Sequence, residues 1–426
     1  MDIPQGYKQT ELGIIPEDWE VKSFSQVFDM YPNNTYPRDC MNDSYGAIRN
    51  IHYGDILIKY PTIVDVERCS IPYLNEDVKI KAQKFVQSGD VIIADTAEDE
   101  TVGKCVEIKN AINAKIVSGL HTFFCHPIRI FAIGWWGYYL NSSNYHNQLL
   151  PYITGIKVSS ISRASIQETK LLVPPIAEQK AIAEALGDID GLIAALDKKI
   201  AKKRLIKQGA MQQLLTGKKR LPGFSDPWVE KKFSDLYRYA SEGGTPDTNN
   251  MRFYANGDVP FVKIEDTETK YIESCNSFIT SEGINNSSAW IVPVNSIIYT
   301  NGATIGNVSI NKIPVATKQG ILGIIPSSII NLEFMYYLLL SQNFKREVDS
   351  RQAKGTFATI VLKSLDEILI YLPPNQMEQI AIATILSDMD KEIVDLEAKR
   401  DKYCLLKSGM MQKLLTGQIR LKKRII

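Results

Sequence analysis

The sequence has no apolar run long enough to cross a membrane and almost no net charge. No stretch reaches 18 consecutive apolar residues, so no membrane-spanning helix and no membrane partner are expected. The formal net charge is +1 for 426 residues, so any indication of nucleic-acid binding must be local. The first residues lack a basic segment followed by an apolar one, so no secretory signal is expected and we expect a cytoplasmic protein.

Cysteine pairs at metal-binding spacing are also missing. The six cysteines are scattered and no C-x-x-C occurs among them. This distribution excludes a zinc ribbon and argues against a disulfide framework, and it fits a reducing compartment. The neighbouring residues His121, Cys125 and His126 match no standard zinc spacing, so we expect no metal there.

The short motifs of common enzymes are absent as well. There is no G-x4-G-K-[ST] phosphate-binding loop, because the segment 216–219 lacks both the first glycine and the final hydroxyl. There is no G-x-S-x-G nucleophile elbow and no Asn/Asp-Pro-Pro-aromatic run of an amino-methyltransferase. We therefore expect a non-catalytic chain that binds no cofactor itself.

The sequence does contain one long segment that occurs twice. Residues 178–190 read EQKAIAEALGDID, and residues 378–390 read EQIAIATILSDMD. Farther along, residues 209–217 read GAMQQLLTG, and residues 409–417 read GMMQKLLTG. The offset of 200 is kept over roughly forty residues, which is too long for a solenoid repeat and indicates a duplicated domain. Two similar surfaces in one chain suggest a target with two parts.

Both copies are predicted to form long helices with an apolar seam at alternating 3–4 spacing. Proline pairs at 174–175 and 373–374 stand where each helix would begin, and Gly217 and Gly417 stand where each would end. About 40 residues at 1.5 Å each make a rod of about 60 Å. The predicted interface consists of the following seam residues: Leu186, Ile189, Ile193, Leu196, Ile200 and Leu214 in the first copy, and Leu386, Met389, Ile393, Leu396, Tyr403, Met410 and Leu414 in the second.

Charge predicts how the two helices pair. Residues 178–197 hold five acids and one base, whereas residues 198–220 hold nine bases and no acid. The second copy repeats this, with six acids and one base in 378–397 and nine bases and one acid in 399–424. Only antiparallel pairing places each acidic half beside a basic half, and it also agrees with the helix dipoles. A generic coiled-coil stalk for dimerisation stays open as another interpretation of these helices.

The segments outside the helices are rich in Gly, Pro, Asn, aromatic and β-branched residues and predict two mixed α/β globules. They are diverged copies, since residues 19–25 parallel residues 228–234 and residues 95–104 parallel residues 300–307. The predicted fold class is α+β: two mixed α/β globular domains, joined and separated by two long antiparallel, coiled-coil-like helices, with an internal pseudo-twofold repeat. The predicted regions are 1–165 (N-terminal segment and first globule), 166–222 (first helix), 223–370 (second globule) and 371–426 (second helix).

Several motifs, found in order along the whole chain, carry a family resemblance. They are the opening segment 6–19, the phrases VPPIAEQ at 173–179 and LPPNQMEQ at 372–379, the endings MQQLLTG at 211–217 and MQKLLTG at 411–417, and VSGLHT at 117–122. With them the chain resembles the DNA specificity subunits of type I restriction–modification systems. The second copy has one extra residue between its prolines and its Glu-Gln pair, which affects local loop geometry alone.

The resemblance implies a division of labour. Each globule would be a target recognition domain that reads one half of a bipartite sequence in double-stranded DNA, and the helices would set the spacer between the halves. The helices would also bind two modification (methyltransferase) subunits, and restriction (translocase and nuclease) subunits would complete an enzyme that cuts unmodified DNA. S-adenosylmethionine, ATP and magnesium would belong to those partners.

Candidate DNA-contacting residues are Arg, Lys, Asn, Gln, His and Tyr side chains near loop glycines or at repeat-matched positions. In the first globule they are Arg49, Asn50, His52, Lys59, Tyr60, Lys115 and His121, and in the second they are Lys263, Asn301, Lys318, Gln319, Arg351 and Lys354.

Three other functions stay open at this point. The recognition subunit of a type IIB system, which cuts on both sides of its site, could have nearly the same sequence. A coiled-coil scaffold without a nucleic-acid role would show no salt-dependent affinity for DNA. An enzyme with an unrecognised active site would show cleavage or methyl transfer by the isolated chain.

Overall fold

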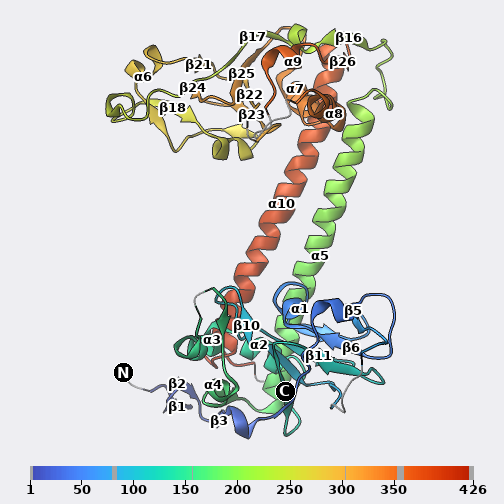
Figure 1. Ribbon diagram of the computed structural model, residues 1–426, viewed down its shortest axis with the longest axis vertical. Coiled ribbons are helices and arrows are strands. Elements are labelled where there is room, and N and C mark those ends of the chain that lie inside the picture. The colour runs from blue at the N-terminus through green and yellow to red at the C-terminus, as the bar shows by residue number, and fades with distance from the viewer. Residues whose placement is uncertain (1–2, 79–83, 156, 303, 353–358, 422–426) are drawn as a thin grey trace. The chain divides into compact units, whose positions relative to one another are not determined.

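The computed structural model describes residues 3–78, 84–155, 157–302, 304–352 and 359–421 (Figure 1). The chain divides into two compact units: unit 1 comprises Met1–Asp197 with Ala398–Ile426, and unit 2 comprises Lys198–Glu397. Two 39-residue helices, α5 (Ile176–Leu214) and α10 (Gln376–Leu414), each contribute one half to either unit. Unit 1 holds the first half of α5 and the second half of α10, and unit 2 holds the complementary halves.

The main sheet of unit 1 has five strands in the order β4-β13-β9-β11-β7. The pairs are antiparallel except β11 with β7, which is parallel. The central strand β9 is the apolar run VIIA, and all four of its residues are buried, as both faces of the sheet are covered. The strands are β4 (Phe28–Tyr31), β13 (Thr122–Pro127), β9 (Val91–Ala94), β11 (Cys105–Lys109) and β7 (Ile63–Asp65).

A second sheet and short helices complete unit 1. The second sheet has the order β12-β6-β8-β5, with β12 and β6 parallel. Its strands are β12 (Ile116–Ser118), β6 (Arg49–Ile51), β8 (Tyr73–Leu74) and β5 (Met41–Asn42). Three two-stranded ribbons pair β1 (Tyr7–Thr10) with β2 (Gly13–Pro16), β3 (Glu20–Ser23) with β15 (Lys170–Val173), and β10 (Thr96–Ala97) with β14 (Ser159–Ser160). The helices are α1 (Tyr53–Ile58), α2 (Trp135–Leu140), α3 (Ser143–Leu149) and α4 (Arg163–Gln167).

Unit 2 repeats this topology. Its main sheet has the order β17-β25-β22-β23-β19, again with one parallel pair at the β19 edge, and β16 pairs with β26 as β3 does with β15. The strands are β16 (Val229–Lys232), β26 (Leu369–Leu372), β17 (Tyr237–Glu242), β25 (Ile321–Pro326), β22 (Ile297–Thr300), β23 (Val308–Asn311) and β19 (Tyr271–Ile272). The helices are α6 (Ser281–Asn285), α7 (Leu332–Leu339), α8 (Gln342–Arg351) and α9 (Leu362–Asp366).

The smaller sheet differs between the units at one edge. In unit 2 its order is β20-β18-β24-β21, and β18 with β24 is the parallel pair that corresponds to β6 with β12. The fourth strand, β21, pairs with β24, whereas β5 in unit 1 pairs with β8. These strands are β20 (Phe278–Ile279), β18 (Val259–Val262), β24 (Val315–Thr317) and β21 (Ile291–Val292). The internal repeat is therefore a repeat of fold with local divergence.

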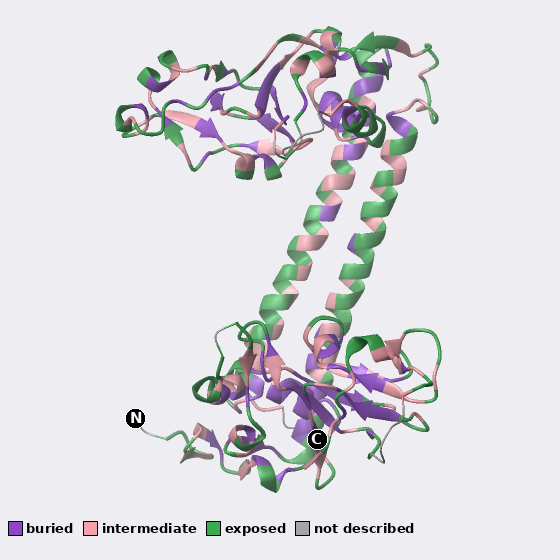
Figure 2. Cartoon of the chain, in the orientation of Figure 1, coloured by how far each residue is buried: buried purple, intermediate pink, exposed green. Residues whose placement is uncertain are grey.

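Each unit has its own core, formed where the aromatic helix α2 or α7 packs on the main sheet (Figure 2). In unit 1 the rings of Trp135 and Tyr139 stack with centroids 5.5 Å apart, and Trp19 meets Trp135 edge-on at 5.9 Å. Leu414 and Leu415 at the end of α10 belong to the same core. Fully burying one leucine contributes about 1.5–3 kcal/mol, so each helix end is firmly attached to a globule.

The apolar seam of the long helices faces inward. Leu186 and Leu386 have no exposed surface, whereas Leu205 and Leu405 on the outer face are 68% and 75% exposed. Every predicted seam residue is buried or half-buried. The buried ones are Leu186, Ile189, Ile200, Leu214, Leu386, Ile393 and Leu414, and the half-buried ones are Ile193, Leu196, Met389, Leu396, Tyr403 and Met410.

Within each unit the two helix halves run antiparallel and are joined by ion pairs. In unit 1, Lys407 Nζ lies 2.6 Å from Asp190 Oδ1, and Arg400 Nη1 lies 3.7 Å from Asp197 Oδ1. Partner numbers descend on one helix as they ascend on the other, which defines the antiparallel sense. In unit 2 the corresponding pairs are Lys203 with Glu392, Arg204 with Glu397, and Lys207 with Asp390. The predicted fold class, with two mixed α/β globules, two long antiparallel helices and an internal repeat, is confirmed.

The repeated Glu-Gln pair holds the first turn of α5 and of α10 in place through hydrogen bonds. In unit 1 Arg420 donates from Nε and Nη2 to the two carboxylate oxygens of Glu178, each at 2.7 Å, and Trp19 Nε1 donates to Glu178 Oε2 at 3.0 Å. Gln179 accepts from Ala132 N at 3.0 Å and donates to Pro174 O at 2.8 Å. A bidentate guanidinium compensates the buried carboxylate, which explains why both residue types recur together.

Unit 2 contains the same arrangement. Arg220 donates to Glu378 at 2.7 and 2.8 Å, and Gln379 accepts from Asn331 N at 2.7 Å.

Among the helices formed by described residues, none combines the length and apolar character that a bilayer crossing requires.

Candidate nucleic-acid interface

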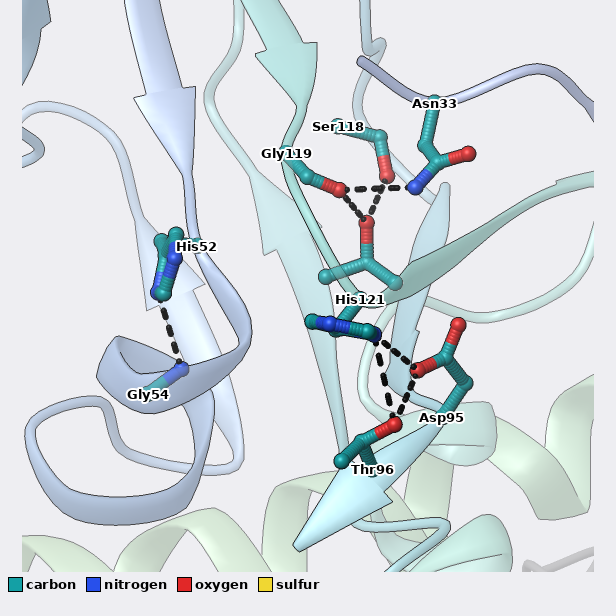
Figure 3. A network of polar contacts seen from close by, with 9 residues as sticks. Asn33, His52, Gly54, Asp95, Thr96, Ser118, Gly119 and His121 are labelled. Atoms are coloured by element: carbon teal, nitrogen blue, oxygen red, sulfur yellow. Dashed lines mark hydrogen bonds and ion pairs between the residues drawn. The ribbon is translucent and has the colours of Figure 1, made fainter. Parts of the chain in front are cut away.

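Three segments of unit 1 meet around His121: the turn after β9, the loop between β12 and β13, and the start of α1 (Figure 3). His121 Nδ1 lies 3.2 Å from Asp95 Oδ1 and 3.3 Å from Thr96 Oγ1, and Thr96 Oγ1 donates to Asp95 Oδ1 at 2.7 Å. His121 has φ of 55°, a left-handed conformation that is uncommon for a residue with a Cβ. This conformation turns the half-exposed ring toward the Asp95 carboxylate.

An aromatic ring bridges the two histidines of this cluster. The ring of Tyr53 lies 4.6 Å from that of His52 and 5.3 Å, edge-on, from that of His121. His52 caps α1 by accepting from Gly54 N at Nδ1, at 3.2 Å. Burial lowers the pKa of His52, so its imidazole is neutral at pH 7. Because His52 is buried, the accessible edge of the cluster consists of His121, Tyr53 and Thr96. These side chains suit contacts with polar base edges.

A second layer of hydrogen bonds holds the loop of residues 119–121. Gly119 O accepts from Asn33 Nδ2 at 3.0 Å and from Thr122 Oγ1 at 2.6 Å (Figure 3). Asn34 Nδ2 donates to Ser118 O at 2.9 Å and to Asn50 Oδ1 at 2.7 Å. Because Asn33 and Asn34 come from one distant segment and Asn50 from another, the fold helps to position the loop.

The cations predicted in unit 1 differ in their availability. Lys59 and Lys115 are exposed, and Lys59 lies 3.9 Å from Asp43. Arg49 is half-buried and donates to Val66 O at 3.3 Å and to the Tyr73 hydroxyl at 3.2 Å. Lys115 and Lys59 are thus exposed enough to reach phosphates, although Lys59 also pairs with Asp43, while Arg49 supports the second sheet.

Three residues of unit 1 that were predicted to contact DNA are buried, so they do not lie at the surface. Asn50 is 0%, Tyr60 6% and His52 8% exposed. Their sequence context of polar residues beside a loop glycine suggested exposure. In the structure Asn50 accepts from Asn34, His52 caps α1, and Tyr60 packs in an apolar cluster. They position the loops that surround the cluster instead of facing solvent.

Unit 2 contains an equivalent loop cluster built from different residues. Asp95 N donates to His121 O at 3.1 Å in unit 1, and Asn301 N donates to Gly320 O at 3.0 Å in unit 2. His121 of unit 1 therefore corresponds to Gly320 of unit 2, and Asp95 corresponds to Asn301. The parallel drawn from sequence, which set residue 95 against residue 300, is therefore wrong by one position.

Asn301, Lys318 and Gln319, three of the residues predicted in unit 2, line one cleft of about 490 Å³. Gln319 is exposed and Lys318 is half-buried, at the end of β24. Asn301 is 4% exposed and lies at the floor, where Nδ2 donates to Ile360 O at 3.1 Å. Glu242, which the sequence did not indicate, accepts from Gly320 N at 2.6 Å and lines the same cleft.

The remaining predicted residues lie elsewhere. Lys263 is half-buried just before Ile264, which lines the cleft. Arg351 ends α8 and is ion-paired with Glu347 one turn earlier. Lys354 lies outside the described residues.

Sequence reasoning also missed Tyr53, Asp95 and Thr96 of the unit 1 cluster. The usable signal was the turn that ends in a glycine, Gly103 or Gly306, after a strand rich in isoleucine, which occurs after both β9 and β22. Within the part of the chain that the structure describes, no group of three or more His, Cys, Asp or Glu side chains could hold a metal ion.

Comparison with known proteins finds similarity to one family. Residues 225–402 match the family model described as type I restriction modification DNA specificity domain. The chain is 25% identical over 436 residues to a putative type I restriction enzyme MjaX specificity subunit of Methanocaldococcus jannaschii, and the match covers 98% of this chain and 97% of that protein. Over nearly its whole length the chain is similar to a type I restriction enzyme specificity subunit.

Further specificity subunits match over part of their length. The MjaIX specificity subunit of the same organism is 32% identical over 41% of this chain and 40% of that protein. The EcoR124I/EcoR124II specificity subunit of Escherichia coli is 29% identical over 35% of this chain and 37% of its own length.

Solved structures of the specificity subunit family share the fold. The crystal structure of a type I restriction–modification S subunit from M. genitalium superposes with a TM-score of 0.55 at 13% identity, covering 97% of this chain and 98% of that one. A chain from a study of complex assembly and conformational transition in the type I system gives 0.56 at 16% identity, covering 95% and 99%.

Proposed function

We propose that this chain is the DNA specificity subunit of a type I restriction–modification complex, in which each unit reads one half of a bipartite duplex sequence. The observation that carries this proposal is the duplicated loop cluster, at His121 in unit 1 and at Gly320 in unit 2, built on the same strand ends but from different side chains. Equivalent frames with different residues suit two half-sites of different sequence. Lys59, Lys115 and Lys318 would contact phosphates, and His121, Thr96 and Gln319 would contact base edges.

The long helices would set the spacer and dock two methyltransferase subunits. Each unit presents one exposed apolar pair on the outer face of its helix half: Leu205 and Ile206 are 68% and 45% exposed, and Leu405 and Leu406 are 75% and 49% exposed. Exposed apolar pairs on otherwise charged helices mark interaction sites, and two equal pairs suit two copies of one partner. Restriction subunits would join this assembly.

In this proposal the chain performs no catalytic step. S-adenosylmethionine, ATP and magnesium would be held by the methyltransferase and restriction subunits. The contribution of this chain is to place those active sites at a chosen sequence.

The test is a genome-wide map of modified bases in cells with and without the gene. A bipartite motif with a constant gap should be present in the first and absent in the second. Seven residues inserted after Asp197 in α5 and seven after Glu397 in α10 keep the 3–4 seam in register and add about 10 Å. We expect the gap to lengthen by about three base pairs at about 3.4 Å each while both half-motifs stay the same.

The matched control is the same seven residues inserted after the exposed Gly223, which should leave the gap unchanged. A lost or altered half-motif in the helix variant, with an unchanged gap, would contradict the spacer role. Absence of any gene-dependent motif would contradict the proposal as a whole.

A further inference from the structure

A buried hydrogen-bond acceptor in unit 2 has no donor. The side chain of Asn301 is 4% exposed, and its Oδ1 has no hydrogen-bond partner among the described residues. The amide orientation is determined by its other end, because Nδ2 faces Ile360 O at 3.1 Å and a carbonyl can only accept. Reversing the amide would set two oxygens against each other, so the free atom is the oxygen. A buried acceptor without a donor destabilises a fold, and so calls for a function.

The equivalent acceptor in unit 1 is fully used. Asp95 Oδ1 accepts from Thr96 Oγ1 at 2.7 Å and lies 3.2 Å from His121 Nδ1. In unit 2 the residue after the acceptor is Gly302 instead of a threonine, and Gly320 stands where His121 stands in unit 1. Both side chains that occupy the acceptor in unit 1 are therefore absent in unit 2.

The two glycines bring their backbone segments into close contact beside Asn301. A Cβ on Gly302 would lie 3.0 Å from Gly320 Cα, so any larger residue there would press on the opposite backbone. The cleft of about 490 Å³ lined by Asn301 has the donors of Lys318 and Gln319 along it. It thus offers one buried acceptor together with two side chains that can donate.

We propose that this cleft is a subsite for a single exocyclic amino group, that of adenine or cytosine, in the half-site that unit 2 reads. This inference rests on the proposed DNA function. In the major groove only adenine and cytosine present an amino donor, and adenine presents the N7 acceptor beside it. Asn301 Oδ1 accepts from the amino group, and Gln319 donates to the neighbouring acceptor. Unit 1 differs because His121 and Thr96 already contact the corresponding oxygen, Asp95 Oδ1.

The test measures base preference at every position by selecting bound sequences from randomised duplexes, with the full chain assembled with its methyltransferase subunits. Asn301→Leu removes the acceptor at similar size. Gly320→His introduces an imidazole at the position where His121 stands in unit 1. The φ of Gly320 is 84°, in the left-handed region that His121 also adopts. In both variants we expect preference at one base pair of one half-site to fall by about tenfold, with every other position unchanged.

Gly320→His keeps the result interpretable if Asn301→Leu folds poorly. It should leave the unfolding temperature equal or higher, since the new imidazole can donate to Asn301 Oδ1. Asn311→Leu is the matched control, because Asn311 is a buried asparagine of unit 2 whose Oδ1 accepts from Ser296 N and whose Nδ2 donates to Pro293 O, each at 2.8 Å. It should lower the unfolding temperature without changing preference at any single base pair.

Duplexes with purine in place of adenine at the affected position, or 5-methyl-zebularine in place of cytosine, lack the amino group and identify which base is read. Wild-type affinity should fall for one of the two substitutions, while Gly320→His should bind the changed and unchanged duplexes alike. If the wild type reads a bipartite site and both variants keep every preference, the subsite is wrong and the DNA function stands. If the wild type shows no sequence preference, both are wrong.

Discussion

A buried carboxyl group, Glu107 in β11, lies against the first turn of α2 and accepts from Gly137 N at 2.7 Å. Burial raises the pKa of Glu107 to about 7, although backbone N–H groups of α2 oppose the shift. The ordinary value is about 4.5. Below pH 4.5 the group is protonated in both the folded and the unfolded state, and between pH 4.5 and 7 only the folded state keeps the proton. Its contribution to stability is therefore complete below pH 4.5 and is lost as the pH rises to about 7.

Replacing Glu107 with glutamine should remove this pH dependence. By proton linkage the wild type loses roughly 3 kcal/mol of its free energy of unfolding between pH 5 and pH 8, and Glu107→Gln does not. The stability of the variant relative to the wild type should therefore be higher at pH 8 than at pH 5. Chemical denaturation at the two pH values measures the difference. Glu168→Gln, at an exposed glutamate, is the control and should change neither value. An equal effect of Glu107→Gln at both pH values would contradict the assignment.

Each long helix is tied to its globule and to the other helix by one repeated triad. In unit 1 the Tyr138 hydroxyl donates to Asp190 Oδ2 at 2.8 Å, and Lys407 lies 2.6 Å from Asp190 Oδ1. In unit 2 Tyr337 donates to Asp390 Oδ2 at 2.7 Å, and Lys207 pairs with the same carboxylate. The tyrosine comes from α2 or α7, so the carboxylate joins three elements at one point.

Removing the carboxylate should loosen this joint. Asp190→Ala is expected to lower the free energy of unfolding by roughly 1–3 kcal/mol, because a hydroxyl and a cation lose their shared acceptor. Denaturant unfolding followed by circular dichroism measures the change. A double-mutant cycle with Lys407→Met should give a coupling of about 1 kcal/mol. Asp188→Ala, on the exposed face of α5, should have little effect, and an equal loss there would contradict a specific role for the triad.

In the complete assembly, the duplication predicts two separate docking surfaces. Leu205 with Ile206 belongs to unit 2, and Leu405 with Leu406 belongs to unit 1. Changing one pair to serine should release one of two methyltransferase subunits, because each surface loses apolar area that binding would bury. Native mass spectrometry should show the copy number fall from two to one for either paired variant, and to zero when both pairs are changed.

The control for docking is Lys199→Gln, at an exposed polar position on α5, which should leave two copies bound. Two copies retained by the fourfold serine variant would contradict docking through these pairs. Loss of both copies from one paired variant would instead indicate a single shared surface.

How far the sequence predicted the molecule depends on how local each signal is. The two mixed α/β globules were predicted from composition, because short runs rich in β-branched and aromatic residues, such as 91–94 and 135–140, indicate burial. Asn50, His52 and Tyr60 were misjudged, because exposure depends on which way β6 and α1 face once packed. The one-residue error at Asp95 arose because hydrogen bonds across the sheet, and not spacing along the chain, define which loop positions correspond.

The primary structure alone determined the duplication, the two helices, their inward seam and their antiparallel sense, because periodicity and the separation of acidic from basic halves act between residues a turn or a helix length apart. Tertiary structure alone decided which side chains meet at the loop clusters. Strand pairing brings Asp95 to His121 in unit 1 and, separately, Asn301 to Gly320 in unit 2. The difference between an occupied acceptor in unit 1 and a free one in unit 2 therefore exists only after the sheets form.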